Sequence, residues 1–168
     1  MDRMDWHRRF LHMAGLVASW SKDPSTRVGA VIVRPGSWTV VTTGYNGFPR
    51  GVEEMESVDE GLVIATQYND RWKRPQKYQW VEHAERNAIY QAAREGQAID
   101  GCVLYLNWNP CPCTGCARAI IQAGIVEVVG DDRPFAGKGE QWEADLAIAR
   151  EMLDEAGVIM TTIERPGQ

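Results

Sequence analysis

The chain lacks any long apolar run and any excess of basic residues. No stretch reaches the roughly 20 apolar residues that a membrane-spanning helix needs. The N-terminal segment MDRMDWHRR has no apolar centre of the kind found in secretory signals. The 18 lysines and arginines are outnumbered by 23 aspartates and glutamates, giving a formal net charge of -5. We therefore expect a cytoplasmic protein with no membrane partner and no nucleic-acid polymer as partner.

Cysteine is also scarce, with four residues in a chain of 168. In the cytosol such thiols stay reduced, so disulfides are not expected. Three of the four are crowded together, as Cys111, Cys113 and Cys116. This crowding favours a metal site over a disulfide framework.

Hydrophobic periodicity predicts alternating helices and strands in one domain, residues 1–168. Helices are expected near residues 5–19, 81–95, 113–124 and 140–155, and strands near 28–33, 38–45, 103–106, 126–130 and 158–163. Residues 50–80 form a polar stretch too long for a simple connection, so we expect an insertion with some helix, a candidate lid. The order predicts an α/β fold: a three-layer α-β-α arrangement with a mixed five-stranded sheet and helices on both faces.

Two short motifs carry the chemistry: His83-Ala84-Glu85 and Pro112-Cys113-Thr114-Gly115-Cys116. A histidine followed two residues later by glutamate, and then by Pro-Cys-x-x-Cys, is a known signature of zinc deaminases acting on nucleobases. The three metal ligands expected from it are His83, Cys113 and Cys116. Such a set suits a catalytic zinc ion, which keeps its fourth position for water. Cys113 and Cys116 are three residues apart, so both would face one side of a helix at its first turn.

Glu85 is expected to be the catalytic residue rather than a metal ligand. Zinc lowers the pKa of a bound water from about 15.7 to roughly 7. A neighbouring carboxylate then accepts its proton and passes protons to the ring nitrogen and the departing amine. The Cys-x-x-Cys pair alone would also suit a structural zinc site or a redox pair, but neither accounts for the His-x-Glu motif.

These motifs and their surroundings resemble the deoxycytidylate (dCMP) deaminases of the zinc-dependent cytidine/deoxycytidylate deaminase superfamily. The similarity extends over most of the chain, through residues 21–33, 44–49, 83–89, 112–121 and 124–125. It implies a cytidine-deaminase-like fold and the hydrolysis of dCMP to dUMP and ammonia, which supplies dUMP for thymidylate synthesis. It also implies one Zn²⁺ per subunit, because no cysteine precedes Cys102 to hold the second, structural zinc that some members carry.

The resemblance also implies substrate-binding residues. Asn46 matches an asparagine that holds the sugar or base, although Asn-Gly is also a common turn. Ala84 can offer its backbone amide or carbonyl to the edge of the base. One loop combines cations with hydroxyls and is a candidate for the substrate phosphate, a solvated loop being the alternative: Lys22, Ser25, Thr26 and Arg27.

Regulation is a further implication. Many dCMP deaminases are hexamers that dCTP activates and dTTP inhibits, through a site near the Gly-Tyr-Asn-Gly turn and neighbouring subunits. Tyr45, Gly47 and Arg94 are therefore expected effector or oligomer contacts in a homo-oligomer, either a hexamer or a dimer. The basic and aromatic residues 71–74 and 77–80 are another candidate, with a charged surface as the alternative.

The substrate itself stays open at this point. Trp108 and Asn109 precede the Pro-Cys-Pro-Cys run, where the family more often has smaller residues. Related substrates are therefore kept as alternatives: 5-substituted dCMP, dCTP, cytidine and the adenosine of a tRNA. A zinc protein without catalytic activity is the alternative from another class.

Overall fold

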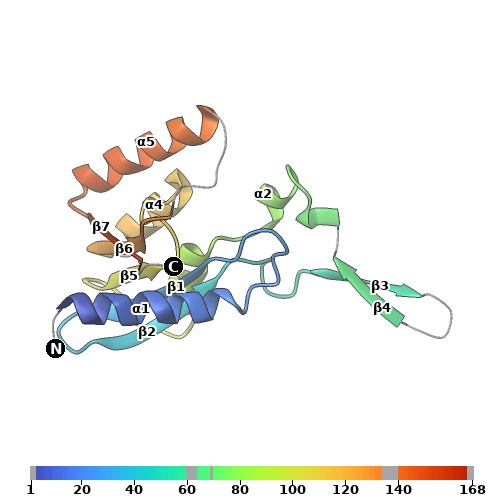
Figure 1. Cartoon of the computed structure of the whole chain (residues 1–168), viewed down its shortest axis with the longest axis horizontal. Helices are drawn as coiled ribbons and strands as arrows, with labels where there is room; N and C mark the ends of the chain where they lie inside the picture. The colour runs from blue at the N-terminus through green and yellow to red at the C-terminus, as the bar shows by residue number, and fades with distance from the viewer. Residues whose placement is uncertain (1–2, 60–63, 69, 134–139, 166–168) are drawn as a thin grey trace.

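The computed structural model describes residues 3–59, 64–68, 70–133 and 140–165. Within them, five strands form one sheet in the order β2-β1-β5-β6-β7 (Figure 1). Its strands are β1 (Gly29–Arg34), β2 (Thr39–Tyr45), β5 (Val103–Leu106), β6 (Glu127–Asp131) and β7 (Ile159–Ile163). β1 runs antiparallel to β2 and β5, while β5, β6 and β7 are parallel. The predicted mixed sheet is confirmed.

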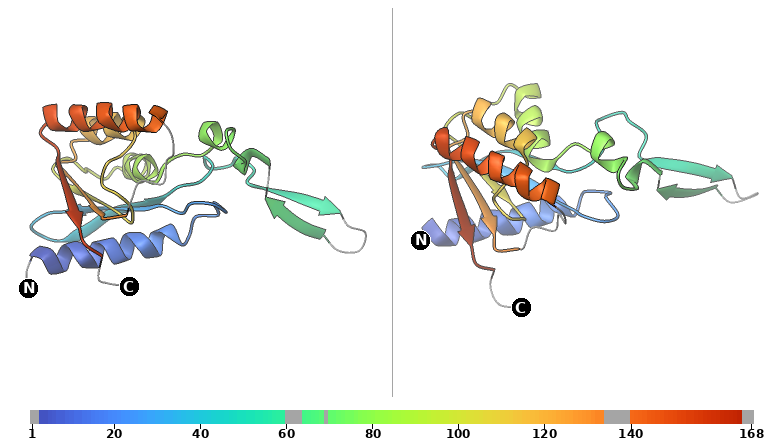
Figure 2. Two further views of the ribbon diagram at one scale, coloured as in Figure 1. Left: turned by 45° about the horizontal axis from the view of Figure 1, so that its top comes forward. Right: turned by 90° about the horizontal axis from the view of Figure 1, so that it is seen from above.

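Helices cover both faces of this sheet (Figure 2). One face carries α1 (Arg3–Ala18), and the other carries α3 (Ala84–Arg94), α4 (Thr114–Gln122) and α5 (Glu140–Glu155). Successive residues of a strand point to opposite faces. Val31 and Val33 accordingly belong to the core under α1, while Ala30 and Ile32 belong to the core under α3 and α4. The three-layer arrangement predicted from the sequence is therefore present.

The helix expected at 81–95 begins later, at Ala84. The segment before it is extended, because the backbone of Glu82 pairs with Gly47 in an isolated antiparallel bridge. His83 is the N-cap residue, with φ -80° and ψ 153°. The bridge holds the turn that follows β2 beside the start of α3, and this start is where the metal ligand was predicted.

A close contact between β2 and α3 sets the height of the helix above the sheet. A β-carbon at Gly44 would lie 2.3 Å from the Ala88 nitrogen and 2.5 Å from the Ala84 oxygen. Only glycine leaves room for the helix backbone to approach a strand this closely. The sheet therefore supports the first turn of α3 directly.

The insertion contains more than the helix that was predicted. Its antiparallel hairpin, β3 (Met55–Asp59) and β4 (Ile64–Tyr68), projects away from the main sheet (Figures 1 and 2). The 3-10 helix η1 (Asp70–Trp72) and the short helix α2 (Lys77–Trp80) follow. Trp72 is buried and stacks on Phe48, with ring centroids 4.4 Å apart, so the segment after the hairpin returns to the domain. No helix in the described ranges is long and apolar enough to cross a membrane.

Candidate metal and active site

Two helices begin at the predicted metal ligands. His83 is the N-cap of α3, and Cys113 is the N-cap of α4 with φ -70° and ψ 163°. Cys116 lies in the first turn of α4 and is fully buried. Neither N-cap residue forms a side-chain capping hydrogen bond, and α3 packs against α4. The exposed amides and dipoles of both helix N-termini favour the thiolate form of nearby cysteines.

The three ligand atoms are spaced for a tetrahedral zinc ion. His83 Nδ1 lies 3.5 Å from Cys113 Sγ and 3.4 Å from Cys116 Sγ. All three atoms lie within 4.8 Å of one another. Bond lengths of about 2.3 Å to sulfur and 2.0–2.1 Å to nitrogen place tetrahedral nitrogen and sulfur ligands about 3.6 Å apart. The predicted ligand set therefore fits zinc in both chemistry and spacing.

The hydrogen bond between Cys113 and Cys116 shifts the pKa values of the two thiols in opposite directions. Hydrogen bonding with Cys116 lowers the pKa of Cys113 to about 4, against the effect of burial and with help from His83. The same hydrogen bond, together with burial, raises the pKa of Cys116 well above its ordinary value. The pair thus releases its first proton easily and its second with difficulty. A cation at this position is what stabilises the second thiolate, because it compensates the added negative charge.

The start of α4 is held by a residue of α5. The backbone amide of Thr114 donates to Asp145 Oδ2 over 3.0 Å, and the Thr114 hydroxyl donates to Asp145 Oδ1 over 2.7 Å. A carboxylate that accepts from the first-turn amides of a helix caps it. Asp145 therefore positions the helix turn that carries both cysteine ligands.

Glu85 lies beside the ligands in the first turn of α3 and is only 8% exposed. Burial raises the pKa of Glu85 above its ordinary range, because a charged carboxylate loses its solvation there. Glu85 lines a pocket of about 550 Å³ together with His83 and Cys113. Three further residues predicted to bind substrate line the same pocket: Thr26, Asn46 and Ala84.

Comparisons with known proteins agree with this site. Residues 4–130 match the family described as the cytidine and deoxycytidylate deaminase zinc-binding region. The chain belongs to this family.

A relative described as an uncharacterized deaminase in the luxG 3' region of Aliivibrio fischeri is 38% identical over 158 residues, 93% of this chain and 92% of that protein. The deoxycytidylate deaminase of Pongo abelii is 34% identical over 157 residues, 94% of this chain and 79% of that protein. The dCMP deaminase of cyanophage S-TIM5, solved with dCMP and dUMP, shares the fold, with a TM-score of 0.68 at 23% identity over 97% of this chain and 99% of that one. Zinc is thus the cofactor of this deaminase family, and the His/Cys/Cys triad is its site.

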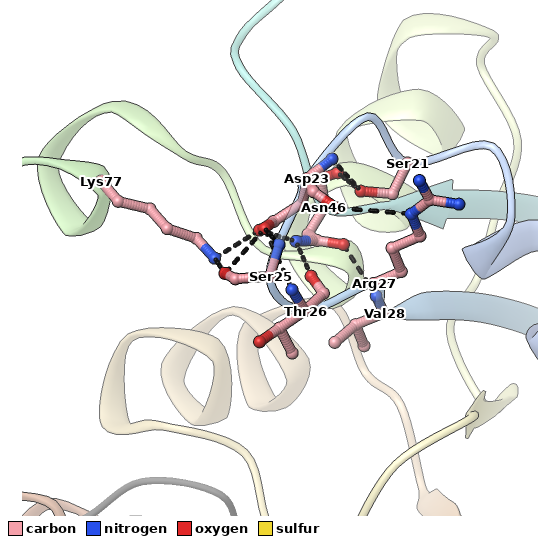
Figure 3. A network of polar contacts seen from close by, with 8 residues as sticks. All are labelled: Ser21, Asp23, Ser25, Thr26, Arg27, Val28, Asn46 and Lys77. Carbon is pink, nitrogen blue, oxygen red and sulfur yellow. Dashed lines mark hydrogen bonds and ion pairs between the residues drawn. The ribbon is translucent and has the colours of Figure 1, made fainter. Parts of the chain in front are cut away.

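Asn46 of the deaminase organises the loop that precedes β1 (Figure 3). Its Nδ2 donates to Asp23 Oδ2 and to the Thr26 carbonyl, both over 2.9 Å. Its Oδ1 accepts from the Val28 amide over 2.7 Å. Both amide hydrogens are therefore used within the protein, and one lone pair of Oδ1 is left for a ligand. Substrate contact by Asn46 stays a prediction.

Lys77 connects the insertion to the same loop (Figure 3). Its Nζ lies 2.5 Å from Asp23 Oδ2 and 2.7 Å from Ser25 Oγ. The Lys77 side chain is 7% exposed, and that of Asp23 is fully buried. Burial alone would raise the pKa of Asp23, but hydrogen bonds from Lys77, Ser25 and Thr26 lower it. The ion pair anchors α2 against the pocket wall.

Replacing Lys77 with methionine is expected to destabilise the fold by about 3–5 kcal/mol, because Asp23 is left as a buried, unpaired charge. Urea unfolding at pH 7 measures this loss. The stabilisation from ionised Asp23 is present above its unfolded pKa and is lost as the pH falls through its lowered folded pKa. The difference in free energy of unfolding between wild type and Lys77→Met should therefore shrink in acid.

The exposed pair of Lys73 and Asp70, with side chains 74% and 77% exposed, supplies the control. Lys73→Met should change stability little, since exposed ion pairs contribute little. An equal effect of both substitutions, or a gap that widens in acid, would contradict the role given to Lys77.

The two cations predicted to hold phosphate do not line this pocket. Lys22 is exposed and pairs with Glu54, with Nζ 2.6 Å from Oε2. Arg27 donates from Nε to the Asp23 carbonyl over 3.3 Å, and its guanidinium points away from Thr26 (Figure 3). Among the described residues, the arginine and the lysine that line it are Arg74 and Lys77. The signal for them in the sequence is the basic and aromatic cluster of the insertion, which the resemblance links to regulation rather than to the substrate.

The predicted effector residues do not all line the same pocket. Tyr45 and Gly47 line a second pocket of about 600 Å³, together with Lys22 and Arg50. Arg94, in the last turn of α3, is exposed and does not line that pocket. The structure thus brings two of the three predicted effector residues together but leaves Arg94 apart.

Proposed function

We propose that this deaminase hydrolyses dCMP to dUMP and ammonia and so supplies dUMP for thymidylate synthesis. One observation carries the proposal: a single pocket is lined by the zinc ligands His83 and Cys113, the buried carboxyl of Glu85 and two cationic side chains. A nucleotide needs a catalytic end for its base and a cationic end for its phosphate. The name of the Pongo abelii relative, deoxycytidylate deaminase, supports the same substrate.

In this proposal, Glu85 moves the protons of the reaction. Zinc held by the triad supplies acidified water as a nucleophile at neutral pH. Glu85 accepts a proton from the water that attacks C4 of cytosine and passes it to the ring nitrogen N3. It then accepts the second water proton and delivers it to the amine, which leaves as ammonia. The raised pKa of Glu85 suits a group that must alternate between base and acid.

The backbone of Ala84 is proposed to hold the edge of the base, and Asn46 the sugar. Both residues line the pocket, and Ala84 separates the ligand His83 from Glu85 in the chain. A base held by the Ala84 backbone would therefore present its amine between the metal and the carboxyl. The apolar residues Val28 and Leu106 line the same pocket and suit the flat faces of a pyrimidine.

Regulation by dCTP and dTTP is proposed for the second pocket. It lies in the Gly-Tyr-Asn-Gly region and offers Arg50 for a triphosphate, together with Lys22, whose partner Glu54 also lines the pocket. Its wall also includes Asn87 of α3, whose Nδ2 donates to the Tyr45 carbonyl over 2.8 Å. Because α3 also carries Glu85, a ligand in this pocket would contact the catalytic helix. Assembly into a homo-oligomer belongs to the same proposal.

A deamination panel tests the proposed substrate. The zinc-loaded protein is given dCMP, 5-methyl-dCMP, dCTP, cytidine, deoxycytidine and tRNA, and ammonia release is measured with and without dCTP and dTTP. We expect the highest kcat/KM with dCMP, raised by dCTP and lowered by dTTP. A higher kcat/KM with another substrate would reassign the enzyme, and zinc-loaded protein that releases no ammonia from any of them would favour the non-catalytic alternative. An unchanged rate with both triphosphates would remove the regulatory part alone.

A further inference from the structure

We propose that Arg74 binds the 5'-phosphate of the substrate and thereby makes the insertion the element that selects nucleotides over nucleosides. This inference rests on the proposed function, because it names the group that recognises the substrate of the same pocket. It places phosphate recognition about fifty residues away in sequence from the loop at 22–27.

One cation among the described residues that line the pocket has no acidic partner within the described part of the chain. Among the described lining residues, Arg74 and Lys77 are the arginine and lysine. Lys77 is buried, and its charge is matched by Asp23 at 2.5 Å. Arg74 is exposed and forms no ion pair with the described residues; its guanidinium lies over the ring of Tyr78, 5.9 Å from the centroid. The positive charge available to an anion is therefore that of Arg74.

The part of the pocket beside the metal ligands offers no lysine or arginine among the described residues. It is lined by the carboxyl of Glu85 and by the ligands His83 and Cys113. A substrate with a base at one end and a phosphate at the other is thus oriented with its base toward Glu85. The guanidinium suits this task because its planar set of donors matches two phosphate oxygens. The hydroxyl of Thr26, in the same pocket, is a further donor.

The segment that carries Arg74 is held at two points. On one side, Lys77 is anchored to Asp23 and Ser25. On the other, the ring of Tyr78 meets that of Trp142 in α5 edge-on, with centroids 5.7 Å apart. Both aromatic residues line the pocket. An arginine on an anchored segment loses less freedom on binding, so its contact with phosphate contributes more to affinity.

Comparing dCMP with deoxycytidine in an Arg74→Gln variant tests this inference. We expect kcat/KM for dCMP to fall about 10- to 100-fold, the range for loss of a hydrogen bond to a charged group. The value for deoxycytidine, which has no phosphate, should stay unchanged. Arg71→Gln is the matched control, since Arg71 lies in the same insertion over the ring of Trp80, at 4.1 Å, and does not line the pocket. It should leave both values unchanged.

A binding measurement separates this inference from the proposed function. Calorimetry with dUMP and deoxyuridine should show that Arg74→Gln weakens the binding of dUMP about 10- to 100-fold and leaves the binding of deoxyuridine unaffected. An equal loss of affinity for the two ligands would show a structural role for Arg74 and overturn the inference. An unchanged affinity for dUMP would also overturn it. If the wild type deaminates neither dCMP nor deoxycytidine, the proposed function fails, and dUMP binding still decides whether Arg74 recognises the phosphate.

Discussion

The variant Glu85→Gln is expected to retain its zinc, and its kcat should fall about 10²- to 10⁴-fold, the range for loss of a general acid-base. Glutamine keeps the size and hydrogen-bonding reach of the side chain but cannot accept a proton. Glu85 lies outside the triad whose atoms cluster, so the zinc content should stay near one per chain. Ammonia release and metal analysis on the same preparation measure the two quantities.

Glu95→Gln is the control for this substitution. Glu95 is the exposed C-cap residue of the same helix, α3, far along it from the ligands. Its substitution removes the same charge without touching the pocket, so activity should be kept. Normal turnover in Glu85→Gln would remove Glu85 from the mechanism. Loss of zinc in that variant would instead identify it as a ligand.

Replacement of Cys116 by alanine is expected to abolish zinc binding and activity together. Its sulfur is buried and lies 3.4 Å from His83 Nδ1. Loss of groups that merely orient metal ligands weakens binding about 10- to 100-fold, so loss of a ligand should exceed that. Zinc content after dialysis, together with ammonia release from dCMP, provides the measurement.

Cys111→Ser is the matched control for the metal site. Cys111 is also buried and lies in the same cysteine-rich run, but its sulfur contacts the carbonyls of Pro112 and Leu146, both at 3.8 Å. It lies outside the triad. We expect this variant to keep a full complement of zinc. Zinc loss from Cys111→Ser with retention in Cys116→Ala would exchange the roles of the two cysteines.

Elements with regular apolar patterns were predictable from the sequence. β1 is buried along five successive residues, and α5 runs over the range expected for it, Glu140–Glu155. The start of α3 was predicted three residues too early, because the bridge between Gly47 and Glu82 is a long-range pairing. The β3-β4 hairpin was missed because its segments, MESVD and IATQY, show no strict alternation of apolar and polar residues.

The metal site was predictable because its information is local. Cys113 and Cys116 share a helix turn whatever the rest of the fold does, and a His-x-Glu motif followed by Pro-Cys-x-x-Cys is typical of zinc deaminases. The sequence therefore determined the ligand types, the metal and the class of reaction. The family match over residues 4–130 agrees with that conclusion.

Which cations line the pocket was decided only by the tertiary structure. The composition of residues 22–27 predicts an anion site, but Lys22 pairs with Glu54 and Asp23 pairs with Lys77. Each of these ion pairs joins residues more than thirty positions apart, so no local pattern reveals them. Because such pairing directs some cations away from the pocket and neutralises others, Arg74 is the lining cation without an acidic partner among the described residues.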